Sequence, residues 1–283
     1  MVLGAGLGTR LRPFTNRIPK PLLPVLGVPC IQFALSHLAE FGVEKAVVNT
    51  HAHAEKLRSY LTSAPVPKLS LIESNEEAQL LGSAGGFQKA LPLFDQNAFF
   101  SMNADVIHFL DLEALHHAHA RFKKERGVLM TLVLASPEVS TKQEGEYTEI
   151  LKSGSEGLVA GLGTKTRGRP FYTGSAIFEK EAFSRVPKNM PSEFVPTVLA
   201  PMIEAKKVAF IESQALWIDI RSPELWARAH HTLSEAQAQS LLSTSVVQLL
   251  KSFDPTCHGQ FELGKHHIRL EDIEYEIKDI GNP

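Results

Sequence analysis

The sequence predicts an α/β fold built on a doubly wound, mostly parallel sheet with an antiparallel extension. Two observations lead to this prediction. In the first half of the chain, short apolar runs alternate with stretches of helical spacing, which is the pattern of parallel strands joined by crossover helices. In the middle of the chain, strand-like runs follow one another through turn-rich connections without a helix between them, which indicates antiparallel pairing.

The first half supplies strands and helices in the order that this fold requires. A short strand is expected at residues 1–3, and apolar runs predict further strands at 45–49, 69–73 and 98–102. Helical spacing predicts helices at 31–41, 55–61 and 84–91. The expected layout is Rossmann-like, with helices on both faces of the sheet.

The second half changes pattern. Strands are expected at 127–135, 147–151, 157–160 and 171–178, as an extension that covers one side of a cleft. Helical spacing returns from Ser192, strands follow at 207–211 and 217–220, and a helix begins near Pro223. Residues 234–253 predict one amphipathic helix, and 273–277 predict a half-buried strand. We therefore expect a domain at residues 1–235 and a C-terminal helical and short-strand appendix at 236–283.

The composition argues against several classes of protein. Lys and Arg total 29 against 31 Asp and Glu, so no global positive field would attract a nucleic acid, and phosphate recognition must be local. Cys30 and Cys257 are too few for a disulfide framework, so a reducing cytoplasm is the expected location. No segment reaches the ~18 apolar residues that a membrane span needs, so no membrane partner is expected.

A glycine-rich segment follows the first strand directly. It reads GAGLGTRLRPFT at residues 4–15 and continues as RIPKPLLP at 17–24. Glycines let a nucleotide lie against the backbone and accept hydrogen bonds from successive N–H groups. The dinucleotide fingerprint is excluded, because it needs glycine where Thr9 stands and a helix that Pro13 prevents. The loop is therefore expected to stay extended.

Two cations in this segment suit phosphate chemistry. Arg10 can present a guanidinium fork to a triphosphate, and Lys20, between two prolines, offers a compact positive charge. Both would offset the charge that builds up in phosphoryl transfer. The alternative is a glycine-rich surface turn that carries two solvated cations.

The segment resembles the signature of the nucleotidyltransferase family that makes nucleotide-sugars, G-x-G-T-R-L-R-P-x-T followed by P-K-P-L-x-P. Further matching stretches extend the resemblance over roughly residues 1–235. The resemblance implies the nucleotide-diphospho-sugar transferase fold and an enzyme that joins a nucleoside triphosphate to a sugar 1-phosphate and releases pyrophosphate. It also implies Mg²⁺ as cofactor, and Arg10, Lys20 and Asp105 as catalytic residues.

The resemblance assigns a nucleotide-binding set. The stretch LGSAGG at 81–86 opens a helix and resembles the family segment beside the base, which makes Gln79 and Gly82 candidates to recognise it. The implied nucleotide-binding residues are Leu3, Gly4, Ala5, Gly6, Gly8, Thr9, Arg10, Lys20, Gln79 and Gly82.

Two aspartates are the implied metal ligands. Asp105 lies in MNADV, at the carboxyl end of a strand, where open α/β sheets place their ligands. Magnesium prefers one or two carboxylates with substrate oxygens and water, so a partner is needed, and Asp219 in WIDI is the candidate. Here the chain departs from the family's W-x-D-I-G-T-P, because Arg221 and Ser222 replace Gly and Thr. We expect an altered turn, with Ser222 capping the next helix. A lone aspartate at either place would more often be a strand-end turn residue or a helix cap, and finding both in their family contexts reverses that preference.

The sugar-phosphate side is implied by shorter matches. The stretch YTGS at 172–175 resembles the family's F-T-G segment, and Lys165 is the candidate for the lysine of its E-K-P motif, although Thr164 replaces the glutamate. The implied sugar-phosphate residues are Asn103, Lys165, Thr173 and Gly174. An exposed loop charge is the alternative for Lys165.

The expected reaction is an in-line attack of the sugar phosphate on the α-phosphorus, with no covalent intermediate and no need for a general base. Two alternatives stay open. One is a catalytically silent subunit that binds a nucleotide or nucleotide-sugar. The other is a nucleotidyltransferase that acts on a phosphoalcohol such as phosphocholine. The sequence leaves open the base, the sugar, and the choice between monomer and homodimer.

Overall fold

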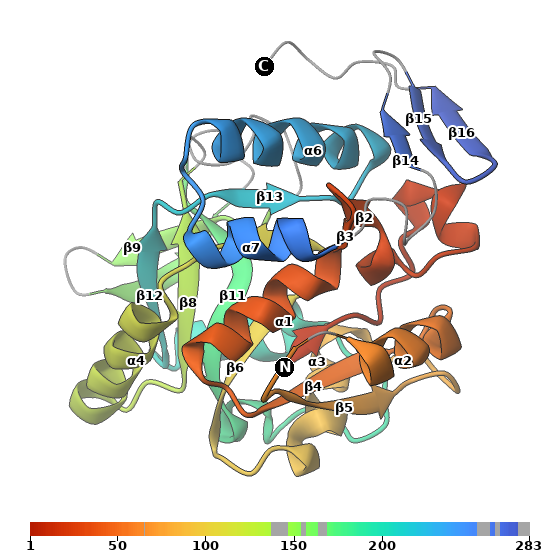
Figure 1. Ribbon diagram of the computed structural model, residues 1–283. Coiled ribbons are helices and arrows are strands. Elements are labelled where there is room, and N and C mark those ends of the chain that lie inside the picture. Colours follow the sequence, from red (N-terminus) through yellow and green to blue (C-terminus); the bar gives the residue numbers. More distant parts are fainter. Residues whose placement is uncertain are drawn as a thin grey trace.

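A nine-stranded mixed sheet forms the centre of the molecule (Figure 1). The computed structural model describes residues 1–64, 66–136, 147–153, 157–163, 169–253, 261–263 and 267–276. Its central strands follow the order β5-β4-β1-β6-β11-β8-β12-β10-β9. Segments that are distant in the sequence therefore meet at this sheet.

The first half of the chain builds the parallel part of the sheet. Its strands are β1 (Val2–Leu3), β4 (Lys45–Thr50), β5 (Ser70–Asn75) and β6 (Ala98–Asn103). The helices between them are α1 (Cys30–Phe41), α2 (Ala54–Ser63) and α3 (Gly82–Ala90). β1 pairs in parallel with β4 and β6, and β4 pairs in parallel with β5. Each strand and helix predicted for this half is present, with bounds shifted by a few residues.

The rest of the sheet is the predicted antiparallel extension. Its strands are β8 (Met130–Ala135), β9 (Ile150–Ser153), β10 (Leu158–Leu162), β11 (Phe171–Glu179) and β12 (Val208–Ser213). β11 pairs antiparallel with β6 and β8, while β12 pairs in parallel with β8. β10 lies antiparallel to both β12 and β9. The predicted fold class is confirmed.

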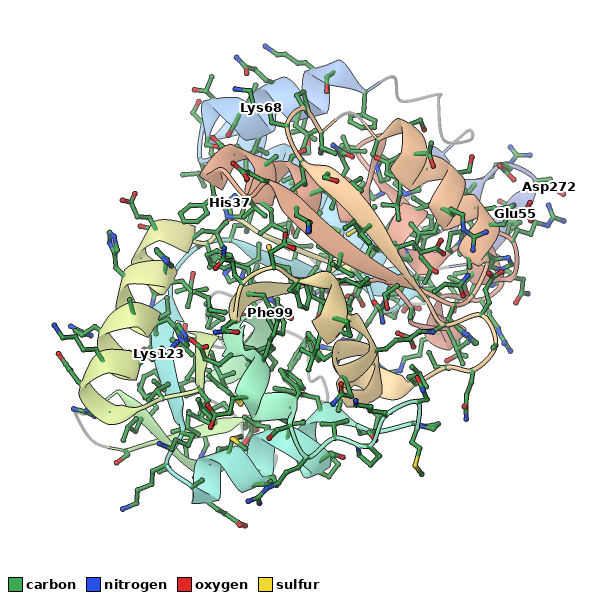
Figure 2. All side chains as sticks on the ribbon, turned by 90° about the horizontal axis from the view of Figure 1, so that it is seen from below. His37, Glu55, Lys68, Phe99, Lys123 and Asp272 are labelled. Atoms are coloured by element: carbon green, nitrogen blue, oxygen red, sulfur yellow. The ribbon has the colours of Figure 1, made fainter. Side chains whose placement is uncertain are left out.

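Helices cover both faces of the sheet. On one face, α1, α2 and α4 (Leu112–Arg126) place Leu35, Leu57 and Leu115 in a buried cluster with Val48 of β4. This explains why the valine-rich strand is hydrophobic on successive residues, since both of its faces are buried. Seen from below in Figure 2, α4 carries Lys123 at one edge of the molecule, and Asp272 lies at the opposite edge.

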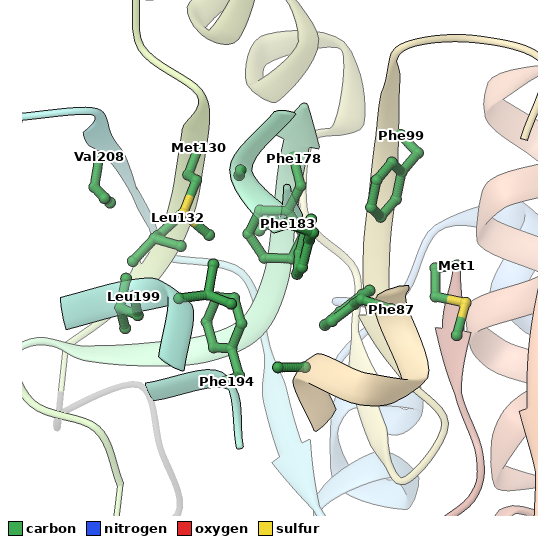
Figure 3. Packing of buried hydrophobic residues seen from close by; sticks show 14 of the residues in the cluster. Met1, Phe87, Phe99, Met130, Leu132, Phe178, Phe183, Phe194, Leu199 and Val208 are labelled. Carbon is green, nitrogen blue, oxygen red and sulfur yellow. The ribbon is translucent and has the colours of Figure 1, made fainter. Parts of the chain in front are cut away.

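Phenylalanines dominate the core on the other face (Figure 3). The ring of Phe87, on α3, lies edge-on to Phe178 with 5.4 Å between ring centroids, and 4.9 Å from Phe183. Phe99 of β6 and Phe194 complete the group. Such pairs add about 0.5–1.5 kcal/mol each beyond the burial of their area. The cluster therefore anchors α3 firmly on the sheet.

The glycine-rich segment is not extended, so that expectation was wrong. It folds into the 3₁₀ turns η1 (Thr9–Leu11), η2 (Phe14–Asn16) and η3 (Lys20–Leu22). The turns carry Leu11, Phe14 and Leu23 into the core, where each is fully buried. Proline forbids a long helix but not a single turn, and burial of these apolar side chains favours the compact path.

The C-terminal part contains one further correction. Strand β13 (Trp217–Asp219) pairs antiparallel with β7 (Val106–His108), and α6 (Pro223–Ala238) follows. The single helix expected over 234–253 is wrong, because α6 ends at Ala238 and a separate α7 (Thr244–Ser252) begins after it. Between them Ser240 has φ +57°, a left-handed conformation that breaks the helix.

A small antiparallel sheet ends the described chain. It consists of β14 (Phe261–Leu263), β15 (His267–Leu270) and β16 (Ile273–Glu276). Figure 1 shows it beside the glycine-rich N-terminal segment. Ile268 and Leu270 are fully buried in one cluster with Phe14 and Trp226. The appendix thus packs against the segment at residues 9–22, while its boundary at residue 235 stays a prediction.

The remaining elements are short. They are β2 (Pro24–Val25), β3 (Val28–Pro29), η4 (Leu91–Leu93), η5 (Lys180–Phe183), the π-helical turn η6 (Val195–Leu199) and α5 (Ala200–Glu204). No helix within the described ranges is long and apolar enough to cross a membrane.

Candidate active site

Two adjacent cavities open where the strands of the parallel part end. The loop cavity, about 360 Å³, is lined by Leu3, Gly4, Ala5, Gly6, Leu80 and Gly82 among others. The aromatic cavity, about 420 Å³, is lined by Thr9, Arg10, Tyr147, Tyr172, Trp217 and Asp219 among others. Both are bordered by Gly8, Lys20, Asn103 and Asp105. These four residues therefore mark the junction of the cavities.

The glycine-rich loop is held by a buried polar chain. The backbone N–H of Gly4 donates to Asn49 Oδ1 at 2.8 Å, and Asn49 Nδ2 donates to Glu76 Oε1 at 2.7 Å. The other oxygen, Glu76 Oε2, accepts from the backbone N–H of Leu81 at 3.0 Å. Glu76 is 1% exposed. One carboxylate thus ties the loop after β1 to the segment that opens α3.

Sequence reasoning missed Glu76 and Asn49. In the printed sequence Glu76 stands next to Glu77, whose side chain is exposed. No local feature of the sequence indicates which of the two carboxylates is buried. Asn49 belongs to a strand that was predicted from its valines. Their role follows from contacts between different elements, which periodicity does not encode.

Gly8 shapes the turn at the junction. Its φ is +63°, and a Cβ at this position would lie 2.8 Å from Thr15 Cγ2. Thr15 Oγ1 also donates to the carbonyl of Gly8 at 2.8 Å. A side chain at residue 8 would therefore clash as well as strain the backbone, so glycine is required here.

Lys20 and Asp105 form an ion pair at the junction of the cavities. Lys20 Nζ donates to Asp105 Oδ2, and their side chains are 12% and 27% exposed. Asp105 follows the end of β6, and Lys20 begins the turn η3. The cation and the carboxylate predicted to handle phosphate and metal are thus in direct contact.

Asp219 lies beside Asp105 because of strand pairing. In the β13–β7 register Asp219 faces Val106, and the backbone N–H of Ile220 donates to the carbonyl of Asp105 at 3.2 Å. Both carboxylates line the aromatic cavity. Burial raises the pKa of Asp219 and the nearby Asp105 raises it further, while the Arg221 and Lys20 cations oppose the rise.

Arg221, where the chain departs from the family motif, lines the aromatic cavity together with Asp219. The backbone N–H of Arg221 donates to Asp219 Oδ1 at 2.9 Å, and its Nε lies 2.5 Å from Asp219 Oδ2. Its guanidinium carbon lies 3.8 Å from the ring centroid of Tyr147. Ser222 caps α6, as predicted, since its Oγ accepts from the backbone N–H of Leu225 at 3.3 Å.

The two aspartates fit magnesium by their donor type. Magnesium takes oxygen ligands and usually combines one or two carboxylates with substrate oxygens and water. Among the residues that the structure describes, no group of three or more His, Cys, Asp or Glu side chains could enclose a metal ion. Asp105 and Asp219 together supply carboxylate oxygens to one cavity and leave further positions for a substrate.

On the side predicted to bind the sugar phosphate, Asn103 and Gly174 are in contact. Gly174 has φ +86°, and a Cβ there would lie 2.7 Å from Asn103 Cγ. Both residues line the aromatic cavity. Thr173 lines it too, but its hydroxyl already donates to the carbonyl of Val133 at 2.9 Å, so this hydroxyl connects β11 to β8.

Two predicted residues are not brought to the cavities. Gln79 is exposed and lines neither of them, whereas its neighbour Leu80 and the next glycine, Gly82, line the loop cavity. Lys165 lies outside the described residues. The other predicted residues line one cavity or both, with Thr9 and Arg10 in the aromatic cavity rather than the loop cavity.

A family model described as Nucleotidyl transferase matches residues 1–235. The chain belongs to the nucleotidyl transferase family. The resemblance inferred from the glycine-rich signature is thereby confirmed, as is the assignment to nucleotidyltransferase enzymes.

The chain is also similar to individual named proteins of this family. The chain is 30% identical over 239 residues to an N-acetylmuramate alpha-1-phosphate uridylyltransferase of Caulobacter vibrioides, covering 83% of this chain and 97% of that protein. It is 26% identical over 253 residues to a UTP–glucose-1-phosphate uridylyltransferase of Synechocystis, covering 83% of this chain but only 63% of that protein.

Solved structures share the fold. The crystal structure of HddC from Yersinia pseudotuberculosis complexed with GMP-PN has a TM-score of 0.66 at 19% identity, covering 82% of this chain and 97% of that one. At this identity the likeness concerns the fold alone.

Proposed function

We propose that the chain is a sugar-1-phosphate nucleotidylyltransferase that converts a nucleoside triphosphate and a sugar 1-phosphate into a nucleotide-sugar and pyrophosphate. One observation carries the proposal: two cavities, one lined by a glycine-rich backbone and one by aromatic side chains, meet at Lys20 and Asp105. A reaction between two phosphorylated substrates needs such a meeting point. The nucleotide would occupy the loop cavity and the sugar the aromatic cavity.

In the proposed reaction a phosphate oxygen of the sugar 1-phosphate attacks the α-phosphorus. The new P–O bond forms as the bond to the β-phosphate breaks, and pyrophosphate leaves with the bonding electrons. The attacking oxygen is already an anion at neutral pH, so no general base is needed. The protein's task is to position two polyanions and offset their repulsion.

Named side chains would share this task. Backbone N–H groups of Gly6 and Gly8 would face the triphosphate, while the N–H of Gly4 stays bonded to Asn49 and holds the loop, and Arg10 and Lys20 would balance the charge of the triphosphate. Asp105 and Asp219 would hold magnesium, which neutralises charge on the phosphates when bound. Asn103 and Gly174 would contact the sugar phosphate. The role of Gln79 in reading the base stays a prediction.

A panel assay tests this function. Pyrophosphate release is measured with each of four triphosphates, GTP, UTP, dTTP and CTP, against several sugar 1-phosphates in the presence of Mg²⁺. Release with at least one pair is expected. The panel includes phosphocholine, because release with that acceptor alone would assign the phosphoalcohol reaction instead. Tight nucleotide binding without release from any pair would point to a silent binding subunit.

Asp105→Asn tests the centre of the site. The amide keeps the shape of the side chain but loses the charge that would hold the metal and pair with Lys20. We expect turnover to fall at least a hundredfold while the melting temperature changes little. Near-wild-type turnover at saturating Mg²⁺ would contradict the assignment.

Location and assembly are part of the same proposal. The cytoplasm is the proposed location, because only two cysteines occur in the sequence and a reducing compartment suits them. Monomer and homodimer stay equally open, and sedimentation of the purified chain distinguishes them.

A further inference from the structure

Both carboxylate oxygens of Asp219 are engaged by one residue. Arg221 uses its backbone N–H for Oδ1, at 2.9 Å, and places its Nε 2.5 Å from Oδ2. The Asp219 side chain is 8% exposed, so little of it faces water. Asp105, the other predicted metal ligand, pairs with Lys20 through Oδ2 but is more open, with 27% of its side chain exposed.

The Arg221 guanidinium is held in place by few contacts. It lies on the face of Tyr147, 3.8 Å from the ring centroid, and its side chain is 16% exposed. Its Nε and Nη2 are buried, and neither has a hydrogen-bond partner among the residues that the structure describes, so the contact of Nε with Oδ2 is an ion pair and not a hydrogen bond. The pairing with Asp219 and the contact with the tyrosine ring therefore keep this side chain where it is.

A divalent cation bound to Asp219 would lie within a few ångströms of the guanidinium that pairs with the same carboxylate. The two cannot lie against Oδ2 together, because both are positive and the carboxylate is nearly buried. Even at the dielectric constant of water, a single charge about 5 Å from a divalent ion weakens binding of that ion by more than tenfold. The arginine must move before Asp219 can act as a ligand.

We propose that Arg221 and the divalent cation are alternative occupants of the Asp219 carboxylate, so that Arg221 masks one of the two metal ligands in the free protein. The inference rests on the proposed function, since it takes Asp105 and Asp219 as the metal site. Asp105 receives the cation first, and Asp219 joins only when the guanidinium leaves it. The departure at residue 221 thus weakens the affinity of the free protein for metal.

The test is a double-variant cycle read by Mn²⁺ binding to the protein alone, followed through the electron paramagnetic resonance signal of free Mn²⁺. The four proteins are the wild type, Arg221→Met, Asp219→Asn and the combination of both. Methionine keeps an unbranched apolar stem against Tyr147 and removes the charge. Melting curves verify that each variant is folded.

Masking predicts a non-additive cycle. The gain in Mn²⁺ affinity from Arg221→Met should be at least tenfold larger when Asp219 is present than when Asn replaces it, because the field of the arginine acts in both backgrounds but a ligand is uncovered in only one. Asp219→Asn alone should weaken binding, because it leaves the Arg221 charge near the site without its counter-charge. A matched control is Arg17→Met, which removes an arginine paired with Asp272 at the edge of the molecule (Figure 2) and should leave the affinity unchanged.

The alternatives give different results. An equal gain from Arg221→Met in both backgrounds, or no gain, would overturn masking, since the arginine would then act only through its field or not at all. If pyrophosphate release by the wild type persists in that case, the proposed function stands and only the masking fails. Absence of Mn²⁺ binding to all four proteins would overturn the masking and the predicted metal site together.

Discussion

Glu76→Ala is the substitution for which the structure allows the most specific prediction. The carboxylate is 1% exposed and accepts hydrogen bonds from Asn49 Nδ2 at 2.7 Å and from the backbone N–H of Leu81 at 3.0 Å. Alanine leaves both donors buried without this acceptor, at about 1–3 kcal/mol each. We therefore expect the free energy of unfolding to fall by about 2–6 kcal/mol, a large part of the ~5–15 kcal/mol that is typical of a domain.

The same contacts predict where function changes. Asn49 accepts from the N–H of Gly4, which lines the loop cavity. Leu81 lies between Leu80 and Gly82, which also line it, so the hydrogen bonds of Glu76 support both sides of this cavity. In Glu76→Gln one oxygen still accepts, and the loss of a single bond should lower the unfolding free energy by about 1–3 kcal/mol. In that folded variant the KM for the triphosphate should rise more than the KM for the sugar phosphate.

Urea denaturation and steady-state kinetics are the assays. Glu77→Gln is the matched control, because that carboxylate is exposed and its pairs with Arg58 and Asn75 face water, so its free energy of unfolding should fall by less than about 1 kcal/mol. A Glu76→Ala protein whose unfolding free energy stays within about 1 kcal/mol of the wild type would refute the reasoning. That result would mean that water or a shifted side chain accepts hydrogen bonds from both Asn49 Nδ2 and the N–H of Leu81.

Three further predictions follow from single features. Gly174→Ala places a Cβ 2.7 Å from Asn103 Cγ at a φ of +86°, so it should destabilise the protein by about 1–2 kcal/mol and raise the KM for the sugar phosphate selectively; equal KM changes for both substrates in steady-state kinetics would contradict this. Burial lowers the pKa of His108 and His230 to about 3. The unfolded state therefore binds more protons below pH 6.5, and urea titrations should show each histidine removing about 2 kcal/mol of stability between pH 6.5 and 5; a flat profile would exclude it. Trp226→Phe deletes the Nε1 donor that lies 2.7 Å from the buried Pro24 carbonyl, which the His230 ring also approaches, so thermal melting should report a loss of about 0.5–1.5 kcal/mol for this one hydrogen bond; an unchanged melting temperature would show that the bond adds no stability.

Several features of this protein could be read from the sequence alone. Local periodicity predicted the alternating strands and helices of the first half, because burial on one or both sides of an element imposes a pattern on neighbouring residues. The glycine-rich signature at 4–15 and the aspartate at the end of β6 pointed to the family and to the site. Ser222 was predicted as a cap from its place before Pro223, and it is one.

Other expectations failed where tertiary contacts outweigh local preference. The glycine-rich segment forms 3₁₀ turns, since the core accepts Leu11 and Phe14 only along the compact path. The helix expected over 234–253 breaks near Ser240, although the apolar spacing continues through it. The helical pattern reports which residues are apolar, but not where the chain must turn to bury them.

The sequence by itself determined which chemical groups this protein carries and in which short motifs they lie. The tertiary structure decided which of them meet. The pairing of β13 with β7 brings Asp219 beside Asp105, and the ring of Tyr147 lies against the guanidinium that pairs with that carboxylate. Glu76 supports the loop cavity from behind in the same way, through hydrogen bonds to Asn49 and Leu81 in separate elements. Contacts between residues far apart in the chain depend on the whole fold, and no local pattern of residues encodes them.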